Sequence, residues 1–262
     1  MIHLKNIEIP VVDQPGYPYS LPWFKNGGTL EFSQPVTIIT GENGAGKSTF
    51  MNLLASTLGL YRISFEGDAA ARKLEKNVIG FKPGFTLVRP AGFFFEAEAF
   101  ITYIRHLTLL KAEEALELLR IEKAYAEKSD YARMMAKSPH QRSINEMDSL
   151  YEHDLTKRSH GEAYLDFFAS RLRPKQIYLL DEPETPLSSQ NQLTLLAMIK
   201  QAVLEDCQFI IATHSPILSA YPLATIYEIG ASGFHLTEYQ NLESIQLLKQ
   251  FLNAPDRFTR LL

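Results

Sequence analysis

Residues 41–49 read Gly-Glu-Asn-Gly-Ala-Gly-Lys-Ser-Thr, and this stretch decides the fold. It fits the pattern G-x-x-x-x-G-K-[ST], whose defining positions are filled by Gly41, Gly46, Lys47 and Ser48. An apolar run rich in β-branched residues, 36–40, precedes it, and an amphipathic run begins at Ser48. A strand, a glycine-rich turn and a helix in this order are the context that confirms the pattern. The stretch therefore predicts a phosphate-binding loop.

Each residue type in this loop has a chemical reason. Glycines let the backbone approach a polyphosphate and direct several N–H groups at it, and the N-terminus of the next helix favours negative charge. Lys47 can reach the outer phosphates, and the hydroxyl of Ser48 can bind Mg²⁺. We therefore expect the whole loop to bind a nucleotide through Gly41, Glu42, Asn43, Gly44, Ala45, Gly46, Lys47, Ser48 and Thr49.

The composition of the 262-residue chain is that of a globular protein. Its 45 % apolar residues can fill a core, and its net charge of −4 gives no overall basic excess that would attract nucleic acid or an anionic membrane. The single cysteine, Cys207, cannot build a disulfide framework or a zinc site, which fits a reducing, cytoplasmic interior. The N-terminus lacks a signal-peptide core, and no run of about 18 apolar residues predicts a membrane span.

Apolar patterning divides the chain into parts. Strand and helix patterns alternate over residues 1–60 and 173–262, which predicts an α/β fold with a mainly parallel sheet flanked by helices. Residues 61–95 are short strand-like runs cut by Gly and Pro, and we interpret them as a small antiparallel sheet. Residues 96–126 predict a helix, whereas 128–158 are polar, mixed in charge and expected to be solvated, mobile surface. We interpret the middle third as an inserted helical lobe.

An apolar strand pattern at Ile177–Leu180 ends in two acids, Asp181 and Glu182. Ligands bind at the carboxyl ends of strands in parallel sheets. Asp181 is suited to hold Mg²⁺, and Glu182 is suited to polarise an attacking water as a general base. Alone, a pair of solvated acids at a strand end would explain the pattern equally well. The phosphate loop upstream favours the catalytic interpretation.

Two further stretches place polar residues beside predicted elements. The apolar strand pattern at 209–213 ends at His214, where contact with the terminal phosphate of a nucleotide is favoured over a purely structural histidine. Ser159 and Gly161 lie in a Ser-His-Gly-Glu stretch just before a helix and offer a hydroxyl and free N–H groups to an anion. From that window alone, an ordinary helix N-cap is the better explanation of Ser159.

Taken together and in their order along the chain, these four stretches resemble the ABC-type P-loop ATPases. The resemblance covers most of the 262 residues. It implies one ABC-type domain with a core lobe (1–60 and 173–262), a small antiparallel β subdomain (about 61–95) and a helical lobe that carries the signature (about 96–172). It also implies ATP and Mg²⁺ as cofactors and a homodimer that encloses two ATP molecules. Ser159 and Gly161 of one copy would face the terminal phosphate bound by the other.

Within these ATPases, two details resemble the RecF-like and SMC-like branch of DNA repair and chromosome maintenance more than transporter subunits. Residues 181–184 read D-E-P-E where transporters usually carry D-E-P-T, and Ser-Pro follows His214 where transporters usually carry an acid. The chain most resembles compact, stand-alone bacterial ATPases with S-H-G-E and D-E-P-E. The segment between the loop and the signature is too short for a long coiled coil, so the chain is not expected to be an SMC protein.

The chain also departs from the pattern of these ATPases. Their usual glutamine after the small sheet is absent, and Glu98 is the substitute expected at the metal. Ser188 stands where they usually carry an aspartate, so coupling between two sites is expected to differ. An adenine-stacking aromatic is expected upstream of the loop, and the candidates, each equally suited to packing, are Tyr17, Tyr19, Trp23 and Phe24.

Several functions remain open at this level. The preferred one is an ATPase that dimerises on ATP and switches a protein or nucleic-acid complex; the alternative is the ATP-binding subunit of a membrane transporter. A nucleotide-dependent binding module without activity is disfavoured, because all expected catalytic positions are filled. DNA binding stays open because of a basic stretch that includes Arg62, Arg72, Lys73, Lys76, Lys82 and Arg89. A solvated surface explains that stretch at least as well.

Overall fold

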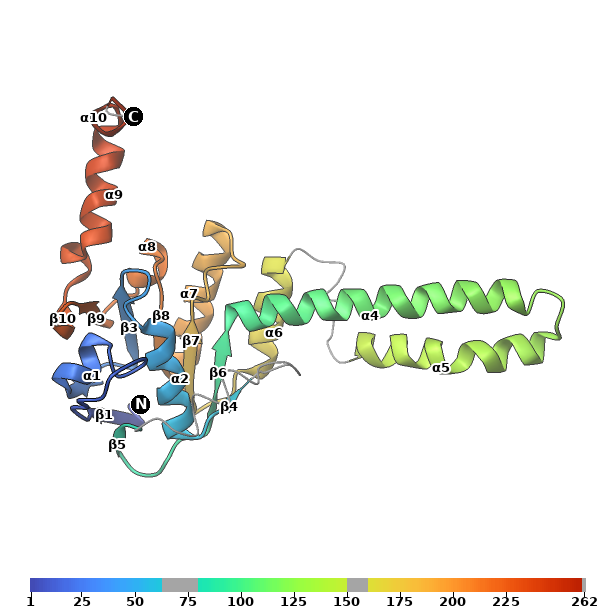
Figure 1. Cartoon of the computed structure of the whole chain (residues 1–262), viewed down its shortest axis with the longest axis horizontal. Helices are drawn as coiled ribbons and strands as arrows, with labels where there is room; N and C mark the ends of the chain where they lie inside the picture. The colour runs from blue at the N-terminus through green and yellow to red at the C-terminus, as the bar shows by residue number, and fades with distance from the viewer. Residues whose placement is uncertain (63–79, 150–159, 261–262) are drawn as a thin grey trace. The chain divides into compact units, whose positions relative to one another are not determined.

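The computed structural model describes residues 1–62, 80–149 and 160–260, which form two compact units (Figure 1). The α/β unit comprises Met1–Ala97 and Leu172–Leu262, and the helical unit comprises Glu98–Arg171. This division lies close to the limits expected for the inserted helical lobe. Each unit is described below by itself.

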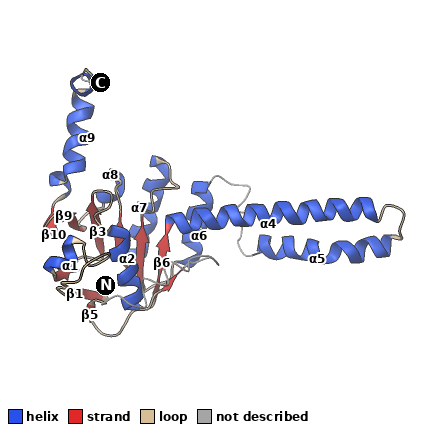
Figure 2. Ribbon diagram, in the orientation of Figure 1, coloured by secondary structure: helices blue, strands red, loops and turns tan. Residues whose placement is uncertain are grey.

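The larger sheet of the α/β unit has seven strands in the order β10-β9-β3-β8-β7-β6-β4 (Figure 2). Neighbouring strands are parallel, except for the antiparallel hairpin of β9 and β10. The strands are β3 (Val36–Gly41), β4 (Tyr61–Arg62), β6 (Gly92–Glu96), β7 (Ile177–Asp181), β8 (Gln208–Ala212), β9 (Thr225–Gly230) and β10 (Gly233–Thr237). All residues of β7 and β8 are buried, as expected for central strands of a parallel sheet. The predicted α/β fold with a mainly parallel sheet is confirmed.

The smaller sheet is antiparallel and has the order β2-β1-β5, formed by β1 (Leu4–Ile9), β2 (Gly28–Glu31) and β5 (Lys82–Phe85). Its position in the sequence differs from the prediction, because β5 alone comes from residues 61–95 while β4 and β6 join the large parallel sheet. The physical reason is burial. Phe93, Phe94 and Phe95 in β6 are all buried, so this strand requires cover on both faces. Residues 63–79 lie outside the described part of the chain.

Helix α2 (Lys47–Leu58) follows the phosphate loop and belongs to the main hydrophobic core. It contributes Phe50, Leu54 and other apolar residues to a core cluster that also holds residues of β1, β2, β3 and β7. The short helix α1 (Pro22–Asn26) adds Trp23 and Phe24, both fully buried. Gly59 ends α2 in a left-handed conformation (φ 57°), which glycine adopts without strain. The core thus fixes the helix whose first residues belong to the loop.

The remaining elements of the α/β unit follow β7 and β8. They are α7 (Ser189–Leu204), α8 (Pro216–Ser219), the 3-10 helix η1 (Tyr239–Asn241), α9 (Glu243–Asn253) and α10 (Pro255–Thr259). Ser188, which stands at the position of the usual aspartate, is the N-cap of α7 and accepts a hydrogen bond from the N–H of Asn191 at 3.2 Å. Its structural role is therefore to begin this helix.

The helical unit consists of α4 (Ala97–Ala124, which begins at the last residue of the α/β unit), α5 (Asp130–Ser149) and α6 (His160–Arg171). Helix α4 confirms the predicted helix, but the expectation of mobile surface over 128–158 was wrong for 130–149. Helices α4 and α5 lie side by side (Figure 1), and ion pairs of Lys137 with Glu122 and of His140 with Glu114 join them. Residues of both charge signs therefore lie on a pair of helices here, which composition alone cannot distinguish from a loop. No helix in the described ranges combines the length and apolar character needed to cross a membrane.

Candidate functional site

The phosphate loop joins β3 to α2 and takes backbone conformations that require glycine. Gly41, Gly44 and Gly46 have φ angles of 146°, 83° and 93°. A Cβ on Gly41 would come within 2.9 Å of the carbonyl oxygen of Ile229, and a Cβ on Gly46 would meet the side chain of Leu21 at the same distance. The backbone conformation explains why glycine stands at these three positions. The resulting loop has a backbone that a polyphosphate can approach.

Lys47, at the start of α2, is only 4 % exposed. Its ammonium donates hydrogen bonds to the carbonyl oxygens of Gly41 and Glu42, both at 3.1 Å, so the side chain lies along its own loop. Burial lowers the pKa of Lys47, and the carboxylates of Glu182, Asp181 and Glu184 oppose this shift. A buried cation bounded by the loop and by acids is the arrangement expected around a polyphosphate with its metal ion.

Asp181 ends β7 and is 7 % exposed. Ser48 lies beside this carboxyl group and acts to lower its pKa, and the carboxyl oxygen Oδ1 is buried with no hydrogen-bond partner among the described residues. Burial raises the pKa of Asp181 to about 7, with further contributions from Glu182 and Glu96, and against the effect of Ser48. A buried oxygen without a partner is costly, and a hydroxyl beside a carboxylate is a donor set that Mg²⁺ accepts. The residues therefore fit the predicted metal ion.

Glu182 and His214 lie at neighbouring strand ends and face each other. Glu182 Oε1 and His214 Nε2 are 3.7 Å apart, and both side chains are partly exposed. Glu182 has a positive φ of 47°, rare for a residue with a side chain, and its N–H donates to the carbonyl of Ala212 at 2.9 Å. Burial and the charge of Lys47 lower the pKa of His214, which favours a neutral imidazole. The structure thus brings Lys47, Asp181, Glu182 and His214 to one edge of the sheet.

Glu96 is a carboxylate of this edge that the sequence analysis missed. It ends β6 in direct register with Asp181 of β7, and it accepts a hydrogen bond from Asn52 Nδ2 at 3.1 Å. Ser48 and Asn52 lie one turn apart on α2, so one face of this helix holds the carboxyl groups of two adjacent strands. The signal in the sequence was a second apolar strand ending in an acid, as at Asp181.

Three predicted residues do not belong to the described part of the α/β unit. Glu98 is an exposed residue in the first turn of α4 and belongs to the helical unit, so its role at the metal stays a prediction. Ser159 lies outside the described residues. Gly161 is in the first turn of α6, also in the helical unit, where it is buried.

The four aromatic candidates for adenine stacking separate clearly by burial. Trp23 and Phe24 are fully buried, and Trp23 Nε1 donates to the carbonyl of Ala45 at 3.3 Å, so these two rings support the loop from within the core. Tyr19 packs edge-on against Phe24. Tyr17 is 61 % exposed, and its hydroxyl hydrogen-bonds to Thr49 Oγ1 at the end of the loop. Of the four, Tyr17 is the ring that a nucleotide in the loop could reach.

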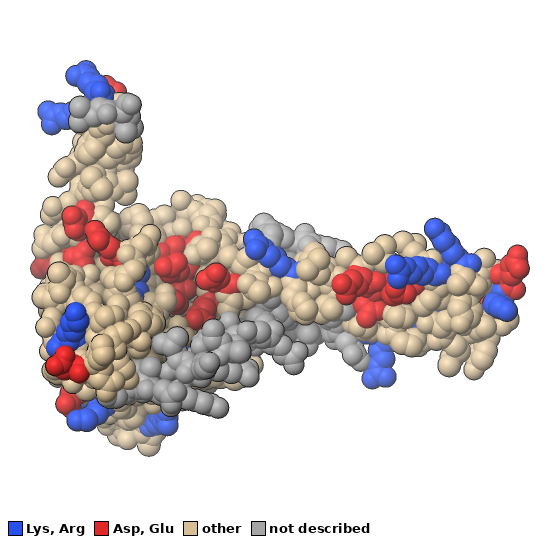
Figure 3. Space-filling model, viewed as in Figure 1, with Lys and Arg blue, Asp and Glu red and all other residues tan. Residues whose placement is uncertain are grey.

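Three of the six basic side chains in the basic stretch belong to the described residues, and each of them contacts another group of the protein. Arg62 donates to Asn52, Lys82 pairs with Glu8 at 3.4 Å, and Arg89 donates to the carbonyls of Leu58 and Thr57 that end α2. Arg72, Lys73 and Lys76 lie outside the described residues. Among the residues coloured in Figure 3, Asp and Glu side chains gather on the visible face of the α/β unit without a comparable group of Lys and Arg.

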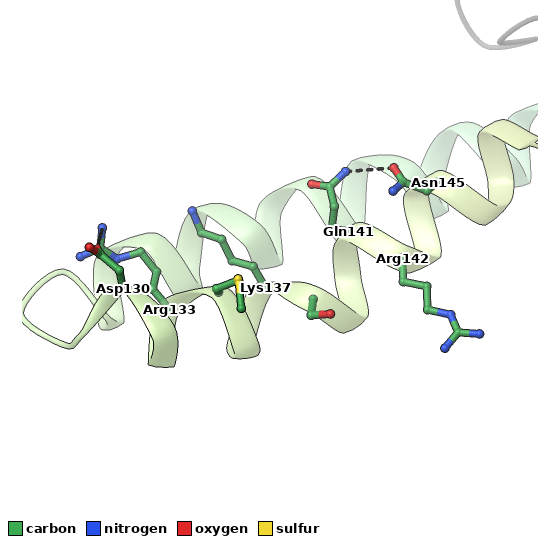
Figure 4. A pocket seen from close by; sticks show the side chains of 8 residues that line it. Asp130, Arg133, Lys137, Gln141, Arg142 and Asn145 are labelled. Carbon is green, nitrogen blue, oxygen red and sulfur yellow. Dashed lines mark hydrogen bonds and ion pairs between the residues drawn. The ribbon is translucent and has the colours of Figure 1, made fainter.

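A pocket of about 800 Å³ lies along α5 of the helical unit (Figure 4). Its lining comes from one helix: Asp130, Arg133, Met134, Lys137, Ser138, Gln141, Arg142 and Asn145. Arg133 and Lys137 are already paired with Asp130 and Glu122. Gln141 donates to Asn145 at 3.1 Å. This face carries no glycine loop and no strand-end carboxylates, so it is not a nucleotide site of the kind at β3 and β7.

Comparison with known proteins agrees with this geometry. A family model described as an AAA domain matches residues 21–84. A Haemophilus influenzae protein described as an uncharacterised ABC transporter ATP-binding protein is 28% identical over 240 residues, covering 86% of this chain and 85% of that protein.

The chain is also similar to solved structures. The cbiO1 protein of Clostridium perfringens, part of an ABC transporter complex, has a TM-score of 0.50 at 13% identity, covering 100% of this chain and 99% of that one. An SMC head domain from Thermotoga maritima has a TM-score of 0.46 at 14% identity, covering 90% and 99%. The likeness to cbiO1 agrees with the predicted fold class.

Proposed function

We propose that the chain, an ABC-type P-loop ATPase, hydrolyses ATP in the presence of Mg²⁺ and uses the reaction to switch a partner between two states. One observation carries this proposal. Asp181 Oδ1 is buried without a partner among the described residues, on a carboxyl group that lies beside Ser48 of the phosphate loop. A fold keeps such an atom where a ligand satisfies it, and here the ligand is the metal ion of a nucleotide.

The roles of the residues follow from their positions. The backbone N–H groups of the loop and the ammonium of Lys47 bind the phosphates, and Ser48 and Asp181 hold Mg²⁺. When bound, the ion neutralises charge that develops on the phosphates. Glu182, which directly follows β7, accepts a proton from the attacking water. His214, 3.7 Å from Glu182, contacts the terminal phosphate as a neutral donor.

The partner-switching step rests on a second copy of the chain. We propose that Ser159 and Gly161 of one copy bind the terminal phosphate held by the loop of the other, so that hydrolysis removes a contact between copies. Because Gly161 is buried in the described structure, the first turn of α6 must become accessible when the dimer forms. The proposed dimer therefore closes with a local change in the helical unit.

The variant Glu182→Gln tests this function most directly. We expect turnover to fall by about 100-fold or more, because the general base is lost while the phosphate loop is intact. ATP affinity should be retained, and light scattering with ATP and Mg²⁺ should show a larger dimer fraction than for the unaltered protein. Glu205→Gln, an exposed change at the end of α7, is the matched control and should behave like the unaltered protein. Normal turnover in Glu182→Gln would remove Glu182 from this role.

A second candidate function is the ATP-binding subunit of a membrane transporter. The description of the Haemophilus influenzae relative favours it. The Glu182→Gln variant also separates the two candidates. Its co-purification from membranes with a membrane-spanning protein would favour the transporter, whereas recovery with a soluble protein or with DNA would favour the preferred function.

A further inference from the structure

The ends of β7 and β8 are the starting point for a further inference. The two strands pair in parallel up to Asp181 and Ala212, and the N–H of Glu182 makes the last backbone bond to Ala212 at 2.9 Å. Beyond this point the chain after β8 turns through His214 and Ser215, whose N–H groups have left the ladder. Buried or half-buried N–H groups require another acceptor.

One side-chain oxygen supplies that acceptor. Glu184 Oε1 accepts hydrogen bonds from the N–H of His214 at 2.7 Å and from the N–H of Ser215 at 3.1 Å. Hydrogen bonds to a charged carboxylate are stronger and more rigid than those between neutral groups. Glu184 therefore joins the segment that carries Glu182 to the segment that carries His214. These are the two residues whose side chains face each other.

The segment beyond His214 is also held in place. Ser215 N–H reaches Thr213 Oγ1 at 2.9 Å, and Ser215 Oγ accepts from the N–H groups of Ile217 and Leu218 at the start of α8. Ser215 Oγ also donates to Gln192 Oε1 of α7 at 2.6 Å. The backbone at His214 thus has a fixed anchor on its C-terminal side, and Glu184 supplies the anchor towards β7.

The link through Glu184 costs folding stability. Its second oxygen, Oε2, is buried without a hydrogen-bond partner among the described residues. A carboxylate that leaves one oxygen in this state costs stability that a neutral side chain would not cost. The length of the Glu184 side chain explains why this residue is present despite the cost of its burial. The side chain must span from the turn after β7 to the N–H of His214.

We propose that Glu184 is a positioning residue that fixes His214 opposite Glu182. The proposal rests on the ATP hydrolysis proposed above, and it assigns a role to the last acid of the D-E-P-E stretch. Glu184 acts through two backbone N–H groups and not by contact with the nucleotide. Glu184 performs this role through the length of its side chain and through the oxygen that accepts both hydrogen bonds.

Two conservative variants separate reach from charge. Glu184→Asp keeps the charge but is one methylene too short, and we expect turnover to fall by about 10- to 100-fold with little change in the KM for ATP, because a small misplacement of a catalytic group has this effect. Glu184→Gln keeps the length and the accepting oxygen, and it should retain most of the turnover. An equal loss in both variants would mean that the charge of Glu184 acts directly, and it would overturn the proposal.

A double variant tests whether Glu184 works through His214. Once His214→Ala has removed the imidazole, Glu184→Asp should cause no further loss of turnover. Losses that multiply would show that Glu184 acts independently of His214, which the proposal excludes. Thermal unfolding of each variant establishes that the comparison is made between folded proteins.

Amide hydrogen exchange gives a measurement that does not depend on ATP hydrolysis. In the protein without nucleotide, the amide proton of His214 should exchange about tenfold faster or more in Glu184→Asp, and near the normal rate in Glu184→Gln. Unchanged exchange in Glu184→Asp would overturn the positional role. If the unaltered protein hydrolyses no ATP while exchange behaves as expected, the proposed function fails and the structural link remains.

Discussion

The strand ends of the α/β unit and helix α5 of the helical unit both carry many charged residues, but they keep them in different ways. At the strand ends, Lys47 and Asp181 are 4 % and 7 % exposed, and Oδ1 of Asp181 has no hydrogen-bond partner among the described residues. On α5, Lys137 pairs with Glu122 of α4, and the two side chains are 29% and 55% exposed. Exposed pairs cost little and contribute little, whereas buried and incompletely paired charges are retained where a ligand completes them.

The strand ends can meet only if β6 and β7 pair closely from their first residues onward. Gly92 begins β6 opposite Ile177, and a Cβ there would lie 1.7 Å from the carbonyl oxygen of Ile177. We expect Gly92→Ala to lower the free energy of unfolding by about 4 kcal/mol or more, because a backbone atom cannot move aside. Gly80→Ala is the control, since its Cβ would meet Thr57 Oγ1 at 3.4 Å. Chemical denaturation compares them, and equal stability would show that the strands can separate without cost.

The burial of Asp181 can be tested through pH. Its pKa is raised in the folded protein from 3.8 to about 7, mainly by burial, so the folded state holds a proton that the unfolded state has already lost. This carboxyl therefore lowers stability increasingly as the pH rises from about 4 to about 7. With metal ions chelated, Asp181→Asn should raise the free energy of unfolding by about 2 to 4 kcal/mol at about pH 8 and by much less at about pH 5.

Asp13→Asn, in an exposed loop, is the control for that experiment and should show no gain that depends on pH. A constant difference between Asp181→Asn and the unaltered protein at both pH values would contradict the burial of Asp181 as the structure describes it.

The two lysines give a direct contrast in nucleotide binding. Lys47→Ala should raise the Kd for ATP by about 10- to 100-fold, because it removes a charged donor from a buried site. Lys137→Ala removes an equal charge from the exposed face of α5 and should leave the Kd unchanged. Isothermal titration calorimetry measures both. An unchanged Kd for Lys47→Ala would argue against the assignment of the phosphate loop.

Local patterns in the sequence indicated candidate site residues, but not the strand pairing around them. The loop at Gly41–Thr49, the acids Asp181 and Glu182 and His214 were singled out because each follows an apolar strand directly, and their roles at a nucleotide stay predictions. The antiparallel sheet was assigned to the wrong strands because pairing partners depend on contacts between distant segments, such as β1 with β5. Glu96 also follows an apolar strand, but its importance depends on its register with Asp181. Strand register cannot be predicted from a local sequence pattern.

By itself, the sequence determined the chemistry that is available to this protein. Loop glycines, a lysine, a hydroxyl and strand-end acids are local choices, and their spacing follows from the geometry of single strands and turns. The tertiary structure alone decided which of these groups meet. It placed Glu96 beside Asp181, His214 opposite Glu182, and Glu184 on the backbone that carries His214. The reason is that parallel strands distant in the sequence are brought together only by the burial of their apolar faces.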